Sequence, residues 1–251
     1  MYLPIPTQST CAKAWVAAAS AISIPAEAYN VVIDVDDPTK FDDRDDEIVA
    51  LIDTFLRGRD LNPIATITNT IFPDALYRKY GSPGFYDEYH TQVYDRLTRS
   101  KQWGRYFERL THHTDGQGGT YNPLRDMIAK LKKVNESDQK FRCVYDLAVY
   151  DPLLDRRYLR GGQCLSFLSF KVHPKRGLTL TATYRNHSYV TRCLGNLIGL
   201  GMLQAFAAKE AGLVVGPLTC VSTHAELDVG TGWGLTEARK LVNKASELLK
   251  G

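Results

Sequence analysis

Apolar residues recur along this chain with two periods, and each period predicts one kind of secondary structure. Within Asp46–Arg57 they follow the i, i+3, i+4, i+7, i+8 spacing of an amphipathic helix, and Gly58 ends that helix. The β-branched run Val31–Val35 predicts a strand. Ile64–Ile71 alternates apolar and polar residues, a pattern that is compatible with a strand or with the beginning of a buried helix.

The pattern is clearest in the second half of the chain. Cys164–Val172 and Leu178–Tyr184 are two strand-like runs joined by the turn sequence Pro174–Gly177, and together they predict a hairpin. Leu194–Ala211 is apolar on nearly all sides, which predicts a buried helix. The remaining predicted elements are helices at residues 12–24, Leu124–Val134 and Leu235–Leu249 and strands at Phe141–Val149 and Val214–Thr223. No repeat or linker separates these elements, so we expect one α+β domain over residues 1–251.

Composition and charge exclude several classes of protein. Of the 251 residues, 44% are hydrophobic and 24% are charged, which is not the composition of a disordered, collagen-like or coiled-coil chain. The net charge of +3 is too small to indicate a nucleic-acid groove, but it suits a small phosphorylated ligand. No apolar run approaches the roughly 20 residues of a membrane span, and the N-terminus lacks the features of a signal peptide. We therefore expect a cytoplasmic protein without a membrane or nucleic-acid partner.

Two features of the sequence raise the question of a metal. The five cysteines are scattered without a CxxC spacing, so we expect neither a structural zinc site nor a disulfide framework, as is usual in a reducing compartment. An acidic stretch extends from Asp34 to Asp46, and it is either a metal site or a solvated loop followed by the acids that a helix N-terminus favours. The metal alternative would use Asp34, Asp36, Asp37, Asp42 and Asp43. Because no His or Cys lies near these acids in the sequence, we expect no metal.

Cys164 is the cysteine whose surroundings suggest chemistry, although a buried structural cysteine is the commoner case. It follows a Gly-Gly-Gln sequence, and Arg156, Arg157 and Arg160 lie just before it. Such cations lower the pKa of a thiol and favour the nucleophilic thiolate. Because a hairpin returns the chain to the point where it began, Arg185 should lie close to Cys164.

Two further polar residues follow the hairpin. Asn196 lies near the start of the predicted buried helix, where it is either an N-terminal cap or a group that reads a ligand. His224 lies at the end of the next strand, where a structural role and a ligand-binding role are both open.

Taken in order, these residues resemble the thymidylate synthase family, which includes the pyrimidine nucleotide hydroxymethylases. The resemblance covers about a quarter of the chain, from Cys164 to Leu227, where the spacings agree within a residue or two. Its elements are Gln163-Cys164, Tyr184-Arg185, Gly195-Asn196, Gly212–Gly216 and Thr223–Leu227. Looser similarities upstream are Phe55–Gly58, Trp103–Arg105 and the pair Lys140 and Arg142. The resemblance implies a large mixed β-sheet flanked by helices, with the sheets of two subunits packing across a dimer.

The resemblance also implies a reaction. The Cys164 thiolate would add to C6 of a pyrimidine nucleotide such as dUMP, and C5 would then take a one-carbon unit from 5,10-methylenetetrahydrofolate. Arg185 would bind the nucleotide phosphate and keep Cys164 ionised. Asn196 would read O4 and N3–H of uracil, and His224 would hold the ribose 3′-hydroxyl. In a homodimer, Lys140 or Arg142 would reach the phosphate bound by the partner subunit.

The chain departs from the family's pattern around this site. The differing residues are Gln163 and Leu165 for Pro and His, Asn186 and Ser188 for Ser and Asp, and Glu226 for Tyr. The family's Asp helps to hold the folate, so its replacement by Ser188 puts folate binding in question. The family's proton-transfer glutamate falls on Leu51 here, and Glu47, one helical turn earlier, is the candidate substitute. The other interpretation of Glu47 is an ordinary acid in the first turn of a helix.

These observations leave more than one functional hypothesis. The first is an enzyme that methylates or hydroxymethylates C5, with methylation favoured because it is the family's commonest activity. The sequence stops 27 residues after His224, before the tail with which the family covers the folate, and exposure of the intermediate to water favours hydroxymethylation. The second hypothesis is a nucleotide-binding homologue without folate chemistry, which Ser188, Glu226 and the short C-terminus support. Gln163, Asn186 and Glu226 complete the candidate substrate-binding residues.

Overall fold

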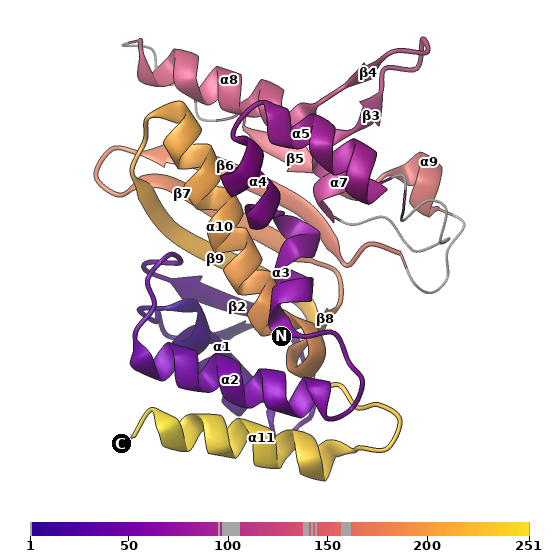
Figure 1. Cartoon of the computed structure of the whole chain (residues 1–251). Coiled ribbons are helices and arrows are strands. Elements are labelled where there is room, and N and C mark those ends of the chain that lie inside the picture. The colour runs from indigo at the N-terminus through magenta and orange to yellow at the C-terminus, as the bar shows by residue number, and fades with distance from the viewer. Residues whose placement is uncertain are drawn as a thin grey trace.

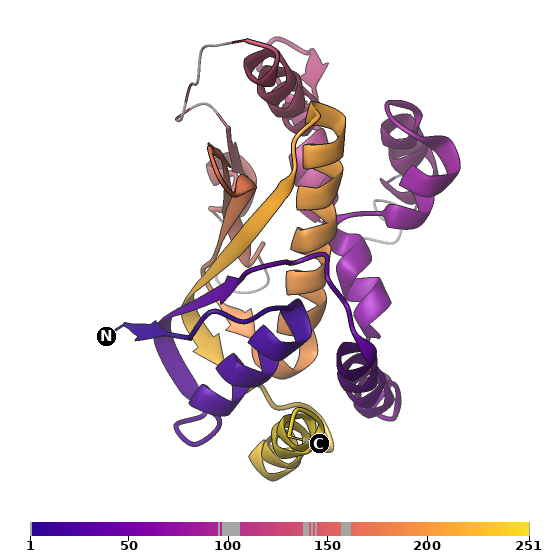
Figure 2. The same ribbon diagram turned by 90° about the vertical axis from the view of Figure 1, so that its left-hand side faces the viewer.

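A mixed β-sheet runs through the molecule, and helices pack on one of its faces (Figures 1 and 2). The computed structural model describes residues 2–94, 96, 106–137, 141, 143, 145–156 and 162–250. Across the sheet, the strands follow the order β1 (Leu3–Pro4), β2 (Glu27–Val35), β9 (Val215–Glu226), β7 (Gly177–Tyr184), β6 (Leu165–His173) and β5 (Asp146–Ala148). The short strand β8 (His187–Ser188) also pairs with β9. This is the α+β fold class that the sequence predicts, with a large mixed sheet flanked by helices.

The helices that cover one face of the sheet and its ends differ widely in length. Those on its covered face and at its ends are α1 (Cys11–Ile22), α2 (Asp43–Arg57), α3 (Ile64–Ile71), α10 (Leu194–Ala211) and α11 (Leu235–Leu248). Shorter or more distant ones are α4 (Asp74–Tyr80), α5 (Gly84–Tyr89), α7 (Tyr106–Thr111), α8 (Pro123–Asn135) and α9 (Pro152–Asp155). Two π-helical turns, η1 (His90–Tyr94) and η2 (Tyr189–Cys193), and a small sheet of β3 (His113–Thr114) and β4 (Thr120–Tyr121) complete the described elements. Among the described residues, no helix combines the length and apolar character needed to cross a membrane.

The α10 helix is the centre of the packing. It connects β7 to the parallel strand β9 and lies on the sheet, and α3 packs against its other side (Figure 2). Glycines allow this close approach, because a Cβ on Gly195 would lie only 2.7 Å from Ile67 Cβ. The Ile64–Ile71 segment, which the sequence left open, is therefore a helix whose buried residues Ile64, Ile67, Thr68 and Ile71 face α10.

Most predicted elements are confirmed, with bounds that differ by up to four residues, and one strand is wrong in its extent. The helix predicted at Leu194–Ala211 has those bounds, and Gly212 caps it in the left-handed region at φ 70°. The α2 helix begins three residues earlier than predicted, because Asp42 caps it and exchanges hydrogen bonds with Asp45. The strand predicted at Phe141–Val149 is wrong in its extent, since the described part forms only β5, where three residues pair with β6.

The acidic stretch is occupied by structural contacts. Asp34 accepts hydrogen bonds from Thr7 and Thr219, Asp36 pairs with Arg176 at 2.6 Å, and Asp42 pairs with Lys13. Asp43, Asp45 and Asp46 lie in the first turn of α2, where the helix dipole favours them. Within the described ranges, no group of three or more His, Cys, Asp and Glu side chains could hold a metal ion.

Candidate active site around Cys164

The hairpin of β6 and β7 brings Cys164 and Arg185 together. Its register pairs Leu165 with Tyr184 at the open end, so the residue before β6 and the residue after β7 are neighbours. The backbone N–H of Arg185 donates a hydrogen bond of 2.9 Å to the carbonyl oxygen of Cys164. The proximity that the sequence predicts for these two residues is confirmed.

Gly162 determines where the Arg185 side chain lies. A Cβ atom at position 162 would fall 2.3 Å from Nη2 of Arg185, so the guanidinium group crosses the face that this glycine leaves open. The guanidinium carbon also lies 6.0 Å from the centre of the Tyr150 ring. The cation is thus held beside the segment that leads into Cys164, although the side chain itself is exposed.

We expect Gly162→Ala to displace the Arg185 guanidinium. If Arg185 binds a phosphate as the family resemblance implies, the variant should bind dUMP about 10- to 100-fold more weakly, the usual worth of one charge-assisted hydrogen bond. Binding of deoxyuridine, which lacks the phosphate, should change by less than about threefold. Calorimetric titration of both ligands measures the difference. Gly84→Ala is the control, because a Cβ there meets nothing closer than 3.9 Å. An equal loss for both ligands would contradict a phosphate-binding role for Arg185.

Opposing influences act on the Cys164 thiol. Burial raises its pKa, Arg185 and Arg192 lower it, and the Glu226 carboxylate raises it again. The sequence predicts that Arg156, Arg157 and Arg160 lower this pKa. For Arg156 this prediction is wrong, because it is not among the charges that act on the thiol. Because burial is the largest influence, the net direction is upward. Arg157 and Arg160 lie outside the described residues.

Sequence reasoning missed Arg192, which lies on the η2 turn before α10. The half-buried Asp228 fixes this turn, because its carboxylate accepts hydrogen bonds from the backbone N–H of Val190 at 2.7 Å and the hydroxyl of Thr191 at 2.6 Å. A basic residue inside an otherwise apolar stretch was the available signal. The packing of η2 that brings Arg192 near Cys164 cannot be inferred from the sequence pattern.

Asn186, His224 and Glu226 form one hydrogen-bonded group. Asn186 Nδ2 donates to Glu226 Oε1 at 3.1 Å, and Asn186 Oδ1 accepts from Nδ1 of His224. Ser188 Oγ donates to the same Glu226 oxygen at 3.1 Å. On its far side, His224 Nε2 lies 3.4 Å from Glu27 Oε2. The structure therefore gathers three of the predicted site residues at the ends of β7, β8 and β9, beside Arg185.

Asn196 belongs to a second, buried group. It is not a helix cap, because α10 begins at Leu194 and η2 precedes it. Its Nδ2 donates to His187 Nε2 at 3.1 Å, so Nδ1 of His187 carries the proton and donates to Ser222 Oγ at 2.9 Å. Burial lowers the pKa of His187 to about 3. His187, which the sequence analysis did not consider, therefore stays neutral and holds Asn196 in place.

The other predicted site residues lie elsewhere or outside the described ranges. Gln163 is buried next to Cys164. Glu47 pairs with Arg44 at 2.9 Å on an exposed part of α2, and within the described residues no contact joins it to the Cys164 group. Lys140, Arg142 and the segment Trp103–Arg105 lie outside the described residues.

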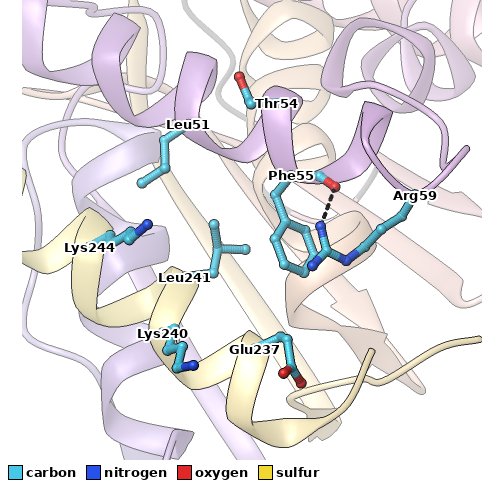
Figure 3. Close-up of a pocket in the computed structure, with 8 residues that line it drawn as sticks. All are labelled: Leu51, Thr54, Phe55, Arg59, Glu237, Lys240, Leu241 and Lys244. Carbon is cyan, nitrogen blue, oxygen red and sulfur yellow. Dashed lines mark hydrogen bonds between the residues drawn. The ribbon is translucent and has the colours of Figure 1, made fainter. Parts of the chain in front are cut away.

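Leu51 does not face Cys164. It lines a pocket of about 300 Å³ between α2 and α11 (Figure 3). Leu51, Phe55 and Leu241 line it, and the Arg59 guanidinium stacks on Phe55 with its carbon 3.7 Å from the ring centre. None of its lining residues belongs to the Cys164 group. The position at which the family pattern places its proton-transfer glutamate therefore faces α11.

No protein-family model matches this chain, and no curated protein sequence matches it either. Among solved structures, the crystal structure of thymidylate synthase from T4 phage aligns with 86% of this chain and 71% of that chain. The TM-score of this alignment is 0.47 and its sequence identity is 15%. A function for this chain therefore has to be supported by its own residues and contacts.

Proposed function

We propose that this chain is an enzyme that modifies C5 of a pyrimidine nucleoside monophosphate through a covalent adduct between Cys164 and C6. The observation that carries the proposal is the pairing of a half-buried thiol with an anion-binding side chain. Cys164 and Arg185 share a backbone hydrogen bond, and the Arg185 guanidinium crosses the adjacent Gly162. A nucleotide whose phosphate binds Arg185 would carry its base into the region of the thiol.

The remaining residues of the site fit the parts of such a nucleotide. Asn196 is held rigidly by His187, and its amide suits the O4 and N3–H edge of uracil. His224 lies at the half-buried end of β9, where its ring can contact the ribose 3′-hydroxyl. When the thiolate adds to C6, C5 becomes nucleophilic, which is the property that a one-carbon transfer needs. In a dimer, Lys140 or Arg142 of the second copy would add a further cation to the phosphate.

The candidate one-carbon donor, 5,10-methylenetetrahydrofolate, fits this site less well. The family's carboxylate for the folate is replaced by Ser188, whose hydroxyl is already committed to Glu226 at 3.1 Å. The described residues therefore offer no equivalent ligand for a pterin at this position. This observation favours, as the second candidate function, a nucleotide-binding homologue that has lost folate chemistry.

Release of tritium from C5 tests the proposal. The protein is incubated with 5-tritiated dUMP, dCMP, UMP and CMP, each with and without methylenetetrahydrofolate, and tritium in water is counted. We expect release from a uracil nucleotide, and mass spectrometry then separates a methylated from a hydroxymethylated product. If no nucleotide releases tritium although binding is measurable, the proposal of an enzyme is wrong. The nucleotide-binding homologue is then the supported function.

We further propose that a second copy packs on the sheet face that the helices leave open (Figure 2). Thr181 lies near the middle of this face, between Ser169 of β6 and Thr219 of β9. In a symmetric dimer each substitution enters the interface twice. We therefore expect Thr181→Arg to weaken self-association by about 100-fold or more, because like charges then meet across the interface.

Sedimentation equilibrium measures this self-association. Ala65→Arg, on an exposed position of α3, is the matched control and should leave the dimer unchanged. A wild-type protein that remains monomeric at high concentration, or a Thr181→Arg variant that dimerises as the wild type does, would contradict the proposed interface.

A further inference from the structure

A reaction at C5 needs a group that gives and takes a proton, and one carboxylate is placed for it beside Cys164. Addition of a thiolate to C6 leaves negative charge at C5, which must be protonated, and the reverse step must remove a proton from C5. Glu47, which the sequence offers for this role, is occupied by Arg44 on α2. Glu226 is the carboxylate whose charge acts on the Cys164 thiol.

We infer that Glu226 is the proton-transfer residue of the Cys164 site, exchanging a proton with C5 of the bound pyrimidine. This inference rests on the proposed function and adds a role to a residue that otherwise only contacts the nucleotide. It follows from the way the carboxylate is held, from its position relative to Cys164 and from the chemistry that C5 requires.

The carboxylate is fixed at one oxygen and free at the other. Glu226 is the last residue of β9 and pairs with Ser188 of β8 in parallel register. Asn186 Nδ2 and Ser188 Oγ both donate to Oε1, each at 3.1 Å. His224 holds the Asn186 amide in this orientation through Oδ1. Within the described part of the chain no hydrogen bond engages Oε2, so this oxygen can accept and donate a proton.

Backbone contacts bring this carboxylate to the thiol. Arg185 N donates to Cys164 O at 2.9 Å, and Asn186, the next residue, holds Glu226. Thr223 Oγ1 donates to Arg185 O at 3.0 Å, which fixes the end of β9 against the end of the hairpin. Cys164, Arg185 and Glu226 therefore lie at the same end of the sheet, where a thiol, a cation and a carboxylate come together.

The exchange balances without any further reactant. The Cys164 S–C6 bond forms, the electrons of the C5–C6 double bond move to C5, and the protonated Glu226 carboxyl gives its proton to C5. In the reverse direction the Glu226 carboxylate removes one of the two hydrogens from C5, the double bond forms again, and Cys164 leaves as thiolate. One cycle replaces the hydrogen at C5 by a hydrogen from water.

Glu226→Gln tests the inference, because the amide keeps an oxygen for Asn186 and Ser188 but carries no exchangeable acid. We expect tritium release from 5-tritiated dUMP to fall by about 100-fold or more, the usual contribution of one acid–base group. The dissociation constant of dUMP, measured by calorimetry, should change by less than about threefold. Glu226→Asp should restore part of the rate, since it returns a carboxylate to the same strand end.

The outcomes separate the inference from the function on which it rests. Glu247→Gln, an exposed carboxylate of α11, is the matched control and should keep the wild-type rate. If Glu226→Gln keeps the wild-type rate, or if its rate falls only as far as its affinity, Glu226 binds the nucleotide and transfers no proton. If the wild type itself releases no tritium with or without methylenetetrahydrofolate, the proposed function fails and the inference fails with it.

Discussion

Cys164→Ala should reduce the release of tritium from C5 by about 10⁴-fold or more, because removal of a covalent nucleophile eliminates the step on which all later ones depend. Binding of the nucleotide should be nearly unchanged, since we propose that its phosphate binds Arg185, and the thiol contributes little to affinity. The rate is measured with 5-tritiated dUMP, and the dissociation constant by calorimetry. A covalent complex with the nucleotide, detectable by mass spectrometry of the intact protein, should be absent in the variant.

The other cysteines provide controls for this result. Cys143 is exposed, and Cys143→Ala should keep the wild-type rate. Burial raises the pKa of Cys220 to about 12 and also raises those of Cys11 and Cys193. Among the described residues, no cation is one of the groups that act on these three thiols, whereas Arg185 and Arg192 both lower the pKa of Cys164, so Cys164 is the better candidate nucleophile. A Cys164→Ala variant with more than about a tenth of the wild-type rate would show that another group performs the reaction.

The part of the site that the sequence predicts correctly is the part encoded by neighbouring residues. The pairing of Cys164 with Arg185 follows from two strands of similar length and one turn, so it needs no knowledge of the rest of the fold. The bounds of α10 follow in the same way from an uninterrupted apolar run and from Gly212, which ends the helix in the left-handed region. Local pattern is sufficient for both.

The contacts that the sequence does not predict join residues far apart in the chain. Asn186 meets Glu226 and His224 because β8 pairs with β9 in parallel register, and α10 lies between these strands in the sequence. The same topology makes Asn196 a partner of the buried His187. A register between distant strands leaves no periodic signal in either of them, so these groups become visible only in the folded chain.

Which carboxylate lies near Cys164 also depends on how the helices and strands pack. The helix carrying Glu47 was predicted correctly, but its Leu51 face packs towards α11 and not towards Cys164 (Figure 3). Helical periodicity identifies the apolar face of a helix, but it does not say which element that face contacts. The carboxylate that we propose for proton transfer comes instead from β9, as Glu226.

His187 should make the protein sensitive to acid. Its ring is fully buried and stacks on Tyr184 with ring centres 4.0 Å apart, and burial lowers its pKa from 6.5 to about 3. Below pH 6.5 this histidine is protonated in the unfolded chain. In the folded chain it stays neutral until the pH approaches 3. The contribution of His187 to stability is therefore complete above pH 6.5 and falls by about 1.4 kcal/mol per pH unit between these values.

Urea unfolding of the wild type and of His187→Gln at about pH 7, 6, 5 and 4.5 measures this dependence. Glutamine can still bond Asn196 and Ser222, but it lacks the ring that stacks on Tyr184, so the variant should be less stable at pH 7. Because glutamine does not titrate, the variant should also lose this part of the pH dependence. By about pH 5 the wild type should have lost about 2 kcal/mol more than the variant. Burial raises the pKa of Asp228, which acts in the opposite direction with pH, but it is present in both proteins and cancels in the difference.

His173 supplies the matched control for the histidine titration. It is the exposed last residue of β6, and its Nδ1 accepts hydrogen bonds from the backbone N–H groups of Lys175 and Arg176 in the following turn, each at 3.1 Å. His173→Gln leaves the buried His187 ring in place, so this variant should keep the loss of stability that we expect from His187 at low pH. If His187→Gln loses stability with falling pH as steeply as the wild type, the buried ring is not the group that titrates. Agreement with the prediction would instead show that protonation of His187 destabilises the fold at low pH. Because His187 accepts a hydrogen bond from Asn196, the same protonation would release the candidate base-reading side chain.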